Sequence, residues 1–524
     1  MRTASLILAP VTALVLCCPA VATTELPPVL VSAARSNVEG LDIPAAATVI
    51  GRREIEDSGA RDIAALLRRV AGVHVSDGIG DGGGALIDMR GFGGSAPSNV
   101  AVLVNGRKIN PASDTATLYL NGIDLDNVEQ IEIVQGSAGT LYGNQAVGGL
   151  INIITRRPDT RSRRLTLGAG SYEAWQLAAG LTERLDSLGL SVQAYRRASD
   201  NYRDRNASDV KRLDGRVEID HDGGLSYLDA QLLDDDVQTP GALFADELAA
   251  DRRQAVSEFR NDYLDTRSRV LRLGTERDLD THWRFEGELA LRDDRRDFVQ
   301  SFRGSPGSRS TQDRESTEIT PRLVGRFDGS VVTLGIDWLR TDYRLVTAFG
   351  PQGNDQDIAA AYAQLTHPLS PALSATVGIR HARVDNDIDN NDTPVHLDDA
   401  VTVGSLGLSY RPVPAWRLFL RADQNYRFAK VDEHTNVLFG QPVGLDTQRG
   451  VSYETGGEYA GSVLRLSARA YRLDKPRSWI LSDKALLQLA EQNPTGAGDL
   501  QRIADLPGAV ARKQGDALLD ALAA

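Results

Sequence analysis

Two strand-forming stretches on either side of a glycine-rich turn decide the fold of this chain. They read Val128-Glu129-Gln130-Ile131-Glu132-Ile133-Val134, then Leu141-Tyr142-Gly143, then Gly148-Gly149-Leu150-Ile151-Asn152-Ile153-Ile154-Thr155. The first stretch alternates acidic or polar residues with apolar ones, as a half-buried β-strand does. The last is rich in β-branched residues and also predicts a strand. Together they predict the end of a globular α+β block that spans residues 38–158.

The sequence before these strands predicts the rest of that block. Residues Arg53 to Arg69 predict a helix that Asp57-Ser58 interrupts. Its apolar residues are spaced to bury one face: Ile63, Leu66, Leu67 and Val70. The strand Val100 to Val104 runs into Asn105-Gly106, the strongest short hairpin signal. The stretch Gly78 to Gly84 lacks the Lys-Ser/Thr and the helix start of a phosphate-binding loop, so it predicts a flexible loop.

The N-terminus predicts export. Arg2 precedes the apolar stretch Ala4 to Cys18, and Ala20-Val21-Ala22 supplies a small-x-small cleavage pattern, so residues 1–22 read as a signal peptide. A short membrane anchor is the alternative, but the stretch is short for a spanning helix. Both cysteines lie in this segment, so the mature chain is expected to form no disulfide. The net charge of −13 argues against nucleic acid as the main partner.

Residues 160–474 predict a membrane barrel made of strands. Apolar and polar residues alternate with a period of two, for example over Trp283 to Arg292 and Trp416 to Asp423. About fifteen strands can be counted, and the connections between them alternate long and short. The expected long loops are 199–209, 235–264, 293–316, 341–357, 385–400 and 428–450. Loops sorted in this way are typical of an outer-membrane barrel, whereas a soluble sandwich has no reason to sort them.

Five motifs in the first block resemble the plug domain of TonB-dependent receptors. They are Met89-Arg90-Gly91-Phe92, Val102 to Gly106, Ile131 to Gly136, Leu141-Tyr142-Gly143 and Gly148 to Thr155. The motif residues are Arg90, Gly91, Asn105, Gly106, Glu132, Gly136, Tyr142, Gly143, Gly148, Gly149 and Asn152. Gln135-Gly136-Ser137 stands where the family has Arg-Gly-Pro, so the resemblance does not carry over a local salt bridge to the barrel.

The resemblance gives a role to the segment 26–34. Two prolines and a β-branched run favour an extended segment that can add to another protein's sheet, although an ordinary edge strand reads the same way. In the family this segment is the TonB box, the strand handed to the energising protein in the periplasm. By that resemblance the box residues here are Pro28, Val29, Leu30, Val31, Ser32 and Ala33.

The resemblance implies a receptor in the outer membrane that imports a scarce nutrient, such as a ferric siderophore or a cobalamin. Its expected partners are TonB with the inner-membrane energising complex, the outer-membrane lipid and the small nutrient. Candidate ligand contacts lie in Gly78 to Gly84, Phe92 to Ser98 and Pro111 to Thr117. No cofactor and no enzymatic activity are expected, because the sequence shows no Ser/His/Asp arrangement and no metal-ligand spacing.

Acidic residues gather in the expected loop 385–400. Asp385, Asp387, Asp389 and Asp392 offer hard oxygen ligands at a density that can hold calcium. A solvated acidic loop is the alternative explanation.

The alternation of strands stops at Leu473-Asp474, and residues 475–524 predict a short all-α tail. Leu486 to Ala490, Leu506-Pro507-Gly508, Arg512-Lys513 and Gly515 to Leu519 resemble the HRDC domain that ends ribonuclease D, while an unrelated helical tail is the alternative. Family barrels have about 22 strands. The sequence therefore predicts a barrel truncated at about fifteen strands and joined to a foreign tail.

Two rival functions remain open at this point. An incomplete barrel leaves backbone groups that lipid cannot satisfy, so the chain is also consistent with a non-functional receptor remnant that is degraded in the periplasm. The HRDC-like tail suggests a nucleic-acid-binding protein, which the export signal argues against. No nucleic acid is expected on the receptor portion.

Overall fold

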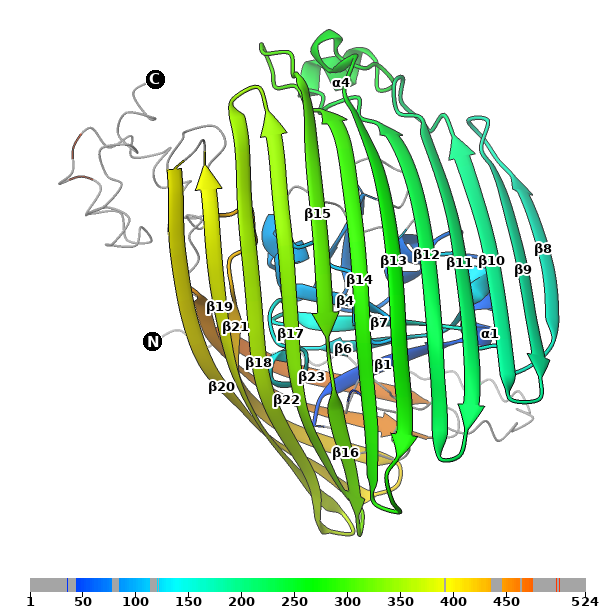
Figure 1. The fold of residues 1–524 in the computed structure, drawn as a ribbon, viewed down its shortest axis with the longest axis vertical. Coiled ribbons are helices and arrows are strands. Elements are labelled where there is room, and N and C mark those ends of the chain that lie inside the picture. Colours follow the sequence, from blue (N-terminus) through cyan, green and yellow to red (C-terminus); the bar gives the residue numbers. More distant parts are fainter. Residues whose placement is uncertain are drawn as a thin grey trace, which may run out of the picture.

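The computed structural model shows a mostly β protein in which a small mixed domain lies against a large curved sheet (Figure 1). It describes residue 35 and residues 44–77, 84–113, 120, 122–390, 393–434, 445–461 and 464–474, with the isolated residues 496 and 499. The predicted signal peptide, the predicted TonB box and nearly all of the predicted helical tail therefore lie outside the described residues. The fold class expected from the sequence, an α+β plug with an antiparallel sheet at about fifteen strand positions, is confirmed.

The described part of the plug contains three short α-helices and seven strands. In chain order its elements are β1 (Ala46–Gly51), α1 (Arg52–Ser58), α2 (Ile63–Leu67), β2 (His74–Asp77), β3 (Ala85–Asp88), η2 (Gly93–Ser98), β4 (Val100–Val104), β5 (Arg107–Lys108), η3 (Leu125–Asn127), β6 (Val128–Gln135), α3 (Gly139–Tyr142) and β7 (Gly149–Thr155). Five strands form one sheet in the order β1-β6-β7-β4-β5, and β2 pairs with β3.

The strands predicted on either side of the turn are neighbours in this sheet. Strand β6 pairs antiparallel with β7, and β7 pairs in parallel with β4. The predicted hairpin at Asn105-Gly106 joins β4 to β5, and both turn residues have positive φ, 51° and 79°. Such values at both central residues are those of a type I′ turn, which asparagine and glycine favour.

The predicted helix over residues 53–69 is two helices rather than one. Helix α1 ends at Ser58, and Gly59 follows in the left-handed conformation at φ 61°. Glycine terminates helices in this way because it has no Cβ to clash there. Helix α2 then buries Ile63, Leu66 and Leu67 against the sheet, as the spacing predicted.

Asp62 caps helix α2 and also connects the plug to the large curved sheet, which we call the wall. Its Oδ1 accepts a hydrogen bond from the backbone N–H of Ala65 at 2.7 Å, and its Oδ2 lies 3.5 Å from a guanidinium nitrogen of Arg197 in the wall. We expect Asp62→Ala to lower the free energy of unfolding of the plug by about 1 kcal/mol, which is typical of a lost N-cap. Asp62→Asn keeps the cap but not the charge, so in urea unfolding it should retain most of that stability. If both variants lose the same free energy of unfolding, the stabilisation comes from the ion pair of Asp62 with Arg197 and not from the helix cap.

Strand β6 is more buried than its alternating pattern predicted. Glu132, expected on a solvated face, is fully buried and accepts a hydrogen bond from Gln130 at 2.7 Å. The reason is that the plug sheet is covered on both faces. One face packs against α1 and α2 through Ile131 and Ile133, and the other packs toward Tyr362 of the wall.

The wall is a single antiparallel sheet. Its strands are β8 (Ser162–Ala169), β9 (Trp175–Leu185), β10 (Leu188–Ser199), β11 (Ser208–His221), β12 (Gly224–Gln238), β13 (Tyr263–Asp278), β14 (Trp283–Val299), β15 (Arg309–Ile319), β16 (Arg322–Phe327), β17 (Ser330–Thr347), β18 (Gly350–Ser370), β19 (Leu373–Asn390), β20 (Thr393–Val413), β21 (Trp416–Arg427), β22 (Gln448–Ala460) and β23 (Arg465–Asp474). The short helices α4 (Ala245–Ala250) and η4 (Ser257–Phe259) lie in the connection between β12 and β13.

These 16 strands occupy fifteen positions, because β15 and β16 pair one after the other with β14 and β17. The break between them falls at Pro321, which has no N–H to donate to a neighbouring strand. The count made from the sequence therefore agrees with the number of positions in the sheet.

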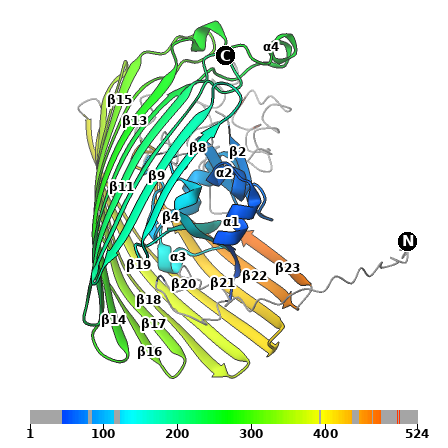
Figure 2. The same cartoon turned by 90° about the vertical axis from the view of Figure 1, so that its right-hand side faces the viewer.

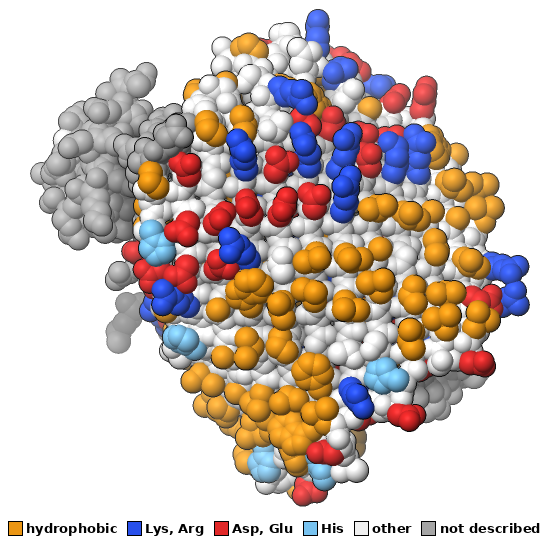
Figure 3. Space-filling model, viewed as in Figure 1, with side chains coloured by type: hydrophobic (Ala, Val, Ile, Leu, Met, Phe, Trp, Pro, Cys, Tyr) orange, Lys and Arg blue, Asp and Glu red, His pale blue; other side chains and the backbone are white. Residues whose placement is uncertain are grey.

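The outer face of the wall has two bands (Figure 3). Apolar side chains cover the part nearer the short turns, and charged side chains cover the part nearer the long connections. Along β13, for example, Leu271 and Leu273 point outward in the apolar band, while Arg267 and Arg269 point outward in the charged band. An apolar band of this kind suits contact with lipid. No helix in the part of the chain that the structure describes has the length and apolar character to cross a bilayer.

The expected sorting of loops is only partly right. The connections after β10, β12 and β21 are long, as expected, but the loops expected at 341–357 and 385–400 are wrong. Strand β17 continues to Thr347, and a tight turn leads into β18; β19 continues to Asn390, and β20 begins at Thr393. The loop expected at 293–316 shrinks to the segment between Val299 and Arg309. These segments resemble loops in composition because their outward residues are charged.

Those outward charges form ion pairs between neighbouring strands, so they are compatible with continued strand pairing. Arg340 on β17 lies 3.4 Å from Asp355 on β18, and Arg383 on β19 lies 3.6 Å from Asp398 on β20. Opposite charges on neighbouring strands favour strand pairing. The strands therefore extend beyond the apolar band.

Within the described residues the wall does not close on itself. The sheet runs from β8 at one end to β23 at the other, and neither has a strand partner on its outer side. Figure 2 shows the plug in the concave face of the sheet, with α1 between β8 and β23 in this view. These two edges expose unpaired backbone N–H and C=O groups, which normally need another strand or a cover.

Candidate functional site: the contact between plug and wall

A buried ion pair joins the plug to the wall. Nη2 of Arg90, in the plug, lies 2.8 Å from Oε1 of Glu454 on β22, and the two side chains are 7% and 3% exposed. The ring of Tyr471 on β23 covers the same guanidinium, with its centroid 3.7 Å from Cζ. The carboxylate and the ring together compensate a charge that burial alone would make costly.

Gly136 gives this pair the space that it needs. A Cβ at this position would lie 2.4 Å from Oε2 of Glu454 and 3.3 Å from a guanidinium nitrogen of Arg90. Gln135-Gly136-Ser137 stands where the family has Arg-Gly-Pro, yet a salt bridge to the wall is present at this place, and Arg90 forms it. Gln135 donates to the carbonyl of Ala71 at 2.7 Å and so holds the plug's own loop.

Most of the other motif residues form turns and contacts within the plug. Asn105 accepts from the N–H of Thr155 at 2.9 Å, and Asn152 accepts from the N–H of Gly106 at 2.9 Å. Gly143 lies against the wall, where a Cβ would be 2.8 Å from the guanidinium of Arg380. These residues are thus used for packing and turn geometry rather than for chemistry.

Arg35 fastens the chain just before the plug. Its Nη1 donates to both carboxylate oxygens of Asp337 on β17 at 3.0 Å and to the carbonyl of Leu141 at 2.8 Å. Its Cζ lies 5.2 Å from the ring centroids of both Tyr142 and Tyr362. We call Arg35 and Asp337 the Arg35 clamp. It holds the plug and the wall together at a point one residue after the predicted box segment 26–34.

The segment that follows β21 folds inward instead of joining an outer loop. The N–H of Phe428 donates to Asn144 at 3.0 Å, and the N–H of Val431 donates to the carbonyl of Ala112 at 3.1 Å. From the wall, Gln356 donates to the carbonyl of Ala429 at 3.1 Å. The first part of the loop expected at 428–450 is therefore a buried bridge between plug and wall.

The described parts of the predicted ligand segments differ in access. In η2, Gly93 and Gly94 are exposed, whereas Ser113 is fully buried and accepts from Arg314 of the wall at 2.9 Å. Residues 78–83 and 114–117 lie outside the described residues. The structure thus places Phe92 to Ser98 partly in the open and covers Pro111 to Ser113.

Three of the four acidic residues proposed for calcium lie on a strand and not in a loop. Asp385, Asp387 and Asp389 are on β19, and the first two point outward beside Arg383 and His396 at 2.8 Å in each case. Among the described residues, no group of three or more His, Cys, Asp or Glu side chains is placed to hold a metal ion. Asp392 lies outside the described residues, so a calcium site that includes it stays a prediction.

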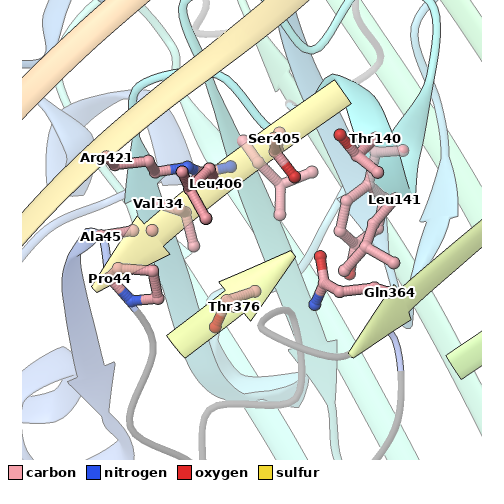
Figure 4. A pocket seen from close by; sticks show the side chains of 14 residues that line it. Pro44, Ala45, Val134, Thr140, Leu141, Gln364, Thr376, Ser405, Leu406 and Arg421 are labelled. Carbon is pink, nitrogen blue, oxygen red and sulfur yellow. The ribbon is translucent and has the colours of Figure 1, made fainter. Parts of the chain in front are cut away.

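Several cavities lie between plug and wall. One of about 40 Å³ is mostly apolar and lies where Pro44, Ala45 and Leu141 of the plug face Thr376 and Ser405 of the wall (Figure 4). It has room for little more than water. Another, of about 120 Å³, lies between the β4–β5 hairpin and strands β14, β15, β17, β18 and β19, and we call it the hairpin cavity.

Family models match the same two parts of the chain. Residues 39–150 match the TonB-dependent Receptor Plug Domain, and residues 212–477, just over half of the chain, match the TonB dependent receptor-like beta-barrel. The chain belongs to the TonB-dependent receptor family. Residues 467–522 also match the HRDC domain, so the resemblance read from the tail agrees with a family model. The HRDC match begins within β23. After β23, only residues 496 and 499 of the matched range belong to the described part of the chain.

Relatives of this TonB-dependent receptor include vitamin B12 transporters named BtuB. The protein from Vibrio vulnificus (strain CMCP6) is 35% identical over 144 residues, which is 27% of this chain and 23% of that protein. The one from Vibrio cholerae serotype O1 (strain ATCC 39541 / Classical Ogawa 395 / O395) is 35% identical over 156 residues, 29% of this chain and 25% of that protein. The matched region thus spans about a quarter of these curated relatives.

Solved structures share the fold over most of this chain. The unliganded ferric citrate transporter FecA gives a TM-score of 0.69 at 17% identity, and the alignment covers 82% of this chain and 70% of the FecA chain. The ferric yersiniabactin uptake receptor FyuA from Yersinia pestis gives 0.66 at 19% identity and covers 84% and 73%. At these identities the likeness shows the fold alone.

Sequence reasoning missed the wall's side of the site. Asp337, Arg380 and Glu454 are charged residues at inward positions of apolar-patterned strands. Their inward position was a usable signal, because a charge on the inner face of a barrel must be solvated or paired. Nothing in the sequence shows which plug residue meets which of them.

Proposed function

We propose that this TonB-dependent receptor carries out energised uptake of a scarce nutrient, such as a ferric siderophore or a cobalamin, across the outer membrane. The observation that supports this proposal best is the plug held in the concave face of the wall by the Arg90–Glu454 pair. The plug and the wall share no strand pairing among the described residues, so the plug can be displaced without unfolding the wall. We further propose that Pro28 to Ala33 is the TonB box and that TonB of the inner-membrane energising complex is the partner.

A proline in the box tests this proposal. TonB is expected to pair with the box as an added strand, which needs backbone N–H donors. Val31→Pro removes one donor and blocks the pairing, so uptake should fall at least tenfold. The matched control Val31→Thr keeps a β-branched residue with its N–H and should retain uptake. The measurement is uptake of radiolabelled ferric citrate and cyanocobalamin by cells that lack other receptors for them, with and without TonB.

Localisation must be measured in the same cells. The wild type and both variants should fractionate with the outer membrane and show heat-modifiable gel mobility, which marks a folded barrel. Normal localisation with TonB-independent uptake, or with equal uptake in Val31→Pro, would contradict the proposal.

A non-functional receptor is the second candidate. The observation in its favour is that β8 and β23 have no outer strand partner within the described residues. It predicts periplasmic fragments and no heat-modifiable form, and those results would replace the importer proposal with this one. A nucleic-acid role through the HRDC-like tail has only the family match behind it.

A further inference from the structure

The hairpin cavity is strongly basic. Charged residues that line it number seven basic and three acidic: Arg35, Arg107, Lys108, Arg292, Arg314, Arg380 and Lys430 against Asp294, Glu318 and Asp337. The basic residues come from the plug side, from the three wall strands β14, β15 and β19, and from the bridge after β21. Charges that face one enclosed space with low-dielectric walls reinforce one another's field. The cavity therefore carries an excess of four positive charges.

Two of the three acidic residues each lie beside two guanidinium groups. Asp337 accepts from Arg35 at 3.0 Å and lies 2.8 Å from Arg380. Asp294 lies 2.8 Å from Arg292 and 3.6 Å from Arg314. One carboxylate between two guanidinium groups neutralises only half of their charge. Each of these clusters therefore remains cationic on the side that faces the cavity.

Arg107 has no such partner. It is 8% exposed and forms no ion pair with the described residues, although Glu318 of the cavity and Glu288 lie near enough to raise its pKa. Burial, with Arg292 and Arg272 nearby, lowers its pKa to about 10. Its neighbour Lys108 is partly buried, donates to the carbonyl of Asn144 at 2.7 Å, and has a pKa that desolvation lowers to about 8. A buried guanidinium that no carboxylate contacts directly is costly, so a protein that keeps one commonly uses it to bind a ligand.

We propose that the hairpin cavity binds a compact oxyanion group, a carboxylate or phosphate, with Arg107 and Lys108 as its principal ligands. This inference rests on the proposed import function and narrows it, because it assigns the receptor an anionic nutrient rather than a neutral one. Guanidinium groups bind planar carboxylate and tetrahedral phosphate oxygens through paired N–H donors. The volume of about 120 Å³ accommodates one such group and not a whole nutrient, so the cavity holds the charged end of a larger ligand.

The test uses the full chain in detergent micelles and inorganic phosphate as the probe. Binding is measured by calorimetry at low ionic strength, where screening is weak. Arg107→Gln and Lys108→Gln should each weaken phosphate binding at least tenfold. Arg107→Lys keeps the charge but not the paired donors, so it should bind more tightly than Arg107→Gln and less tightly than the wild type, a graded order that a purely structural role of Arg107 would not predict. The matched control is Arg61→Gln, an exposed plug arginine outside the cavity.

The pH dependence gives a second readout. Between pH 7 and pH 9 Lys108 loses its proton, so the affinity for sulfate, a tetrahedral oxyanion whose charge is constant over this range, should fall. The charged groups that act on Lys108 are Arg35 and Arg380, which favour this loss, and Glu318 and Asp337, which oppose it. In Lys108→Gln this fall should disappear. Wild-type affinity in both glutamine variants, or phosphate binding that Arg61→Gln weakens equally, would overturn the proposal. If Arg107→Gln does not fold, as judged by gel mobility, Lys108→Gln decides the comparison.

Failure of this inference can be told apart from failure of the import proposal. Phosphate binding is measured on purified protein without TonB, whereas uptake needs cells. TonB-dependent uptake together with unchanged phosphate binding in the variants would leave an importer without an anion site. Phosphate binding that depends on Arg107, without uptake, would leave the site and remove the transport function.

Discussion

Glu454→Gln is expected to lower the free energy of unfolding of the plug by about 3–5 kcal/mol, the usual cost of removing one partner from a buried ion pair. Arg90 stays behind at 7% exposure with its charge, and only the ring of Tyr471 remains to compensate it. The loss should appear in the plug and not in the wall, because the wall's ladder of strand pairs does not depend on this contact.

A thiol placed in the plug core measures this change separately from the wall. The mature chain is expected to contain no cysteine, so Ala64→Cys, at a fully buried position of α2, gives a single reactive group. Its labelling is followed as urea rises. The control Glu56→Gln breaks the exposed pair of Glu56 with Arg52 and should cost at most about 1 kcal/mol. Arg90→Met combined with Glu454→Leu should recover much of the loss, because no unpaired charge is then buried. Equal effects of Glu454→Gln and Glu56→Gln would show that the pair does not hold the plug.

Gly149→Ala is the second change with a large expected effect. Gly149 begins β7 at φ 157°, and a Cβ there would lie 2.4 Å from Cε of Met89 and 2.7 Å from the carbonyl oxygen of Val134. The methionine can move, but the carbonyl belongs to β6, the neighbouring strand in the plug sheet. Backbone strain and overpacking each cost about 1–3 kcal/mol, so the plug should lose about 2–6 kcal/mol.

The same thiol measurement tests this expectation, with Gly94→Ala as its control. A Cβ at Gly94 meets nothing within 4 Å, so that variant should unfold within about 0.5 kcal/mol of the wild type. A stable Gly149→Ala variant would mean that β6 and β7 can separate slightly without loss of the sheet.

The plug was predictable because its local signals agree with one another. Val100 to Val104, the Asn105-Gly106 turn and the closing strand all formed as their residues indicated. The wall was less predictable where its strands leave the apolar band. Outward charges such as Arg340 and Asp385 look like loop composition, and only their cross-strand partners reveal a ladder. Burial of Glu132 was also unpredictable from the strand alone, because the covering residues come from the wall.

The contacts between plug and wall were the least predictable part. Arg90 and Glu454 are 364 positions apart, and Arg35 and Asp337 are 302 apart. Each partner carries a charge that can be recognised in the sequence, but the pairing depends on how the sheet curves around the plug. The basic cavity likewise appears only when five wall strands and the β4–β5 hairpin are brought together.

The Arg35 clamp gives the plug a mechanical order of events. Arg35 follows the proposed TonB box by only two residues, so tension applied at the box reaches this side chain before it reaches β1. The two hydrogen bonds to Asp337 and the contacts with Tyr142 and Tyr362 then bear the load first. If TonB pulls on the proposed box, a weak pull is resisted at the wall, and only a pull that separates Arg35 from Asp337 reaches the strands of the plug sheet.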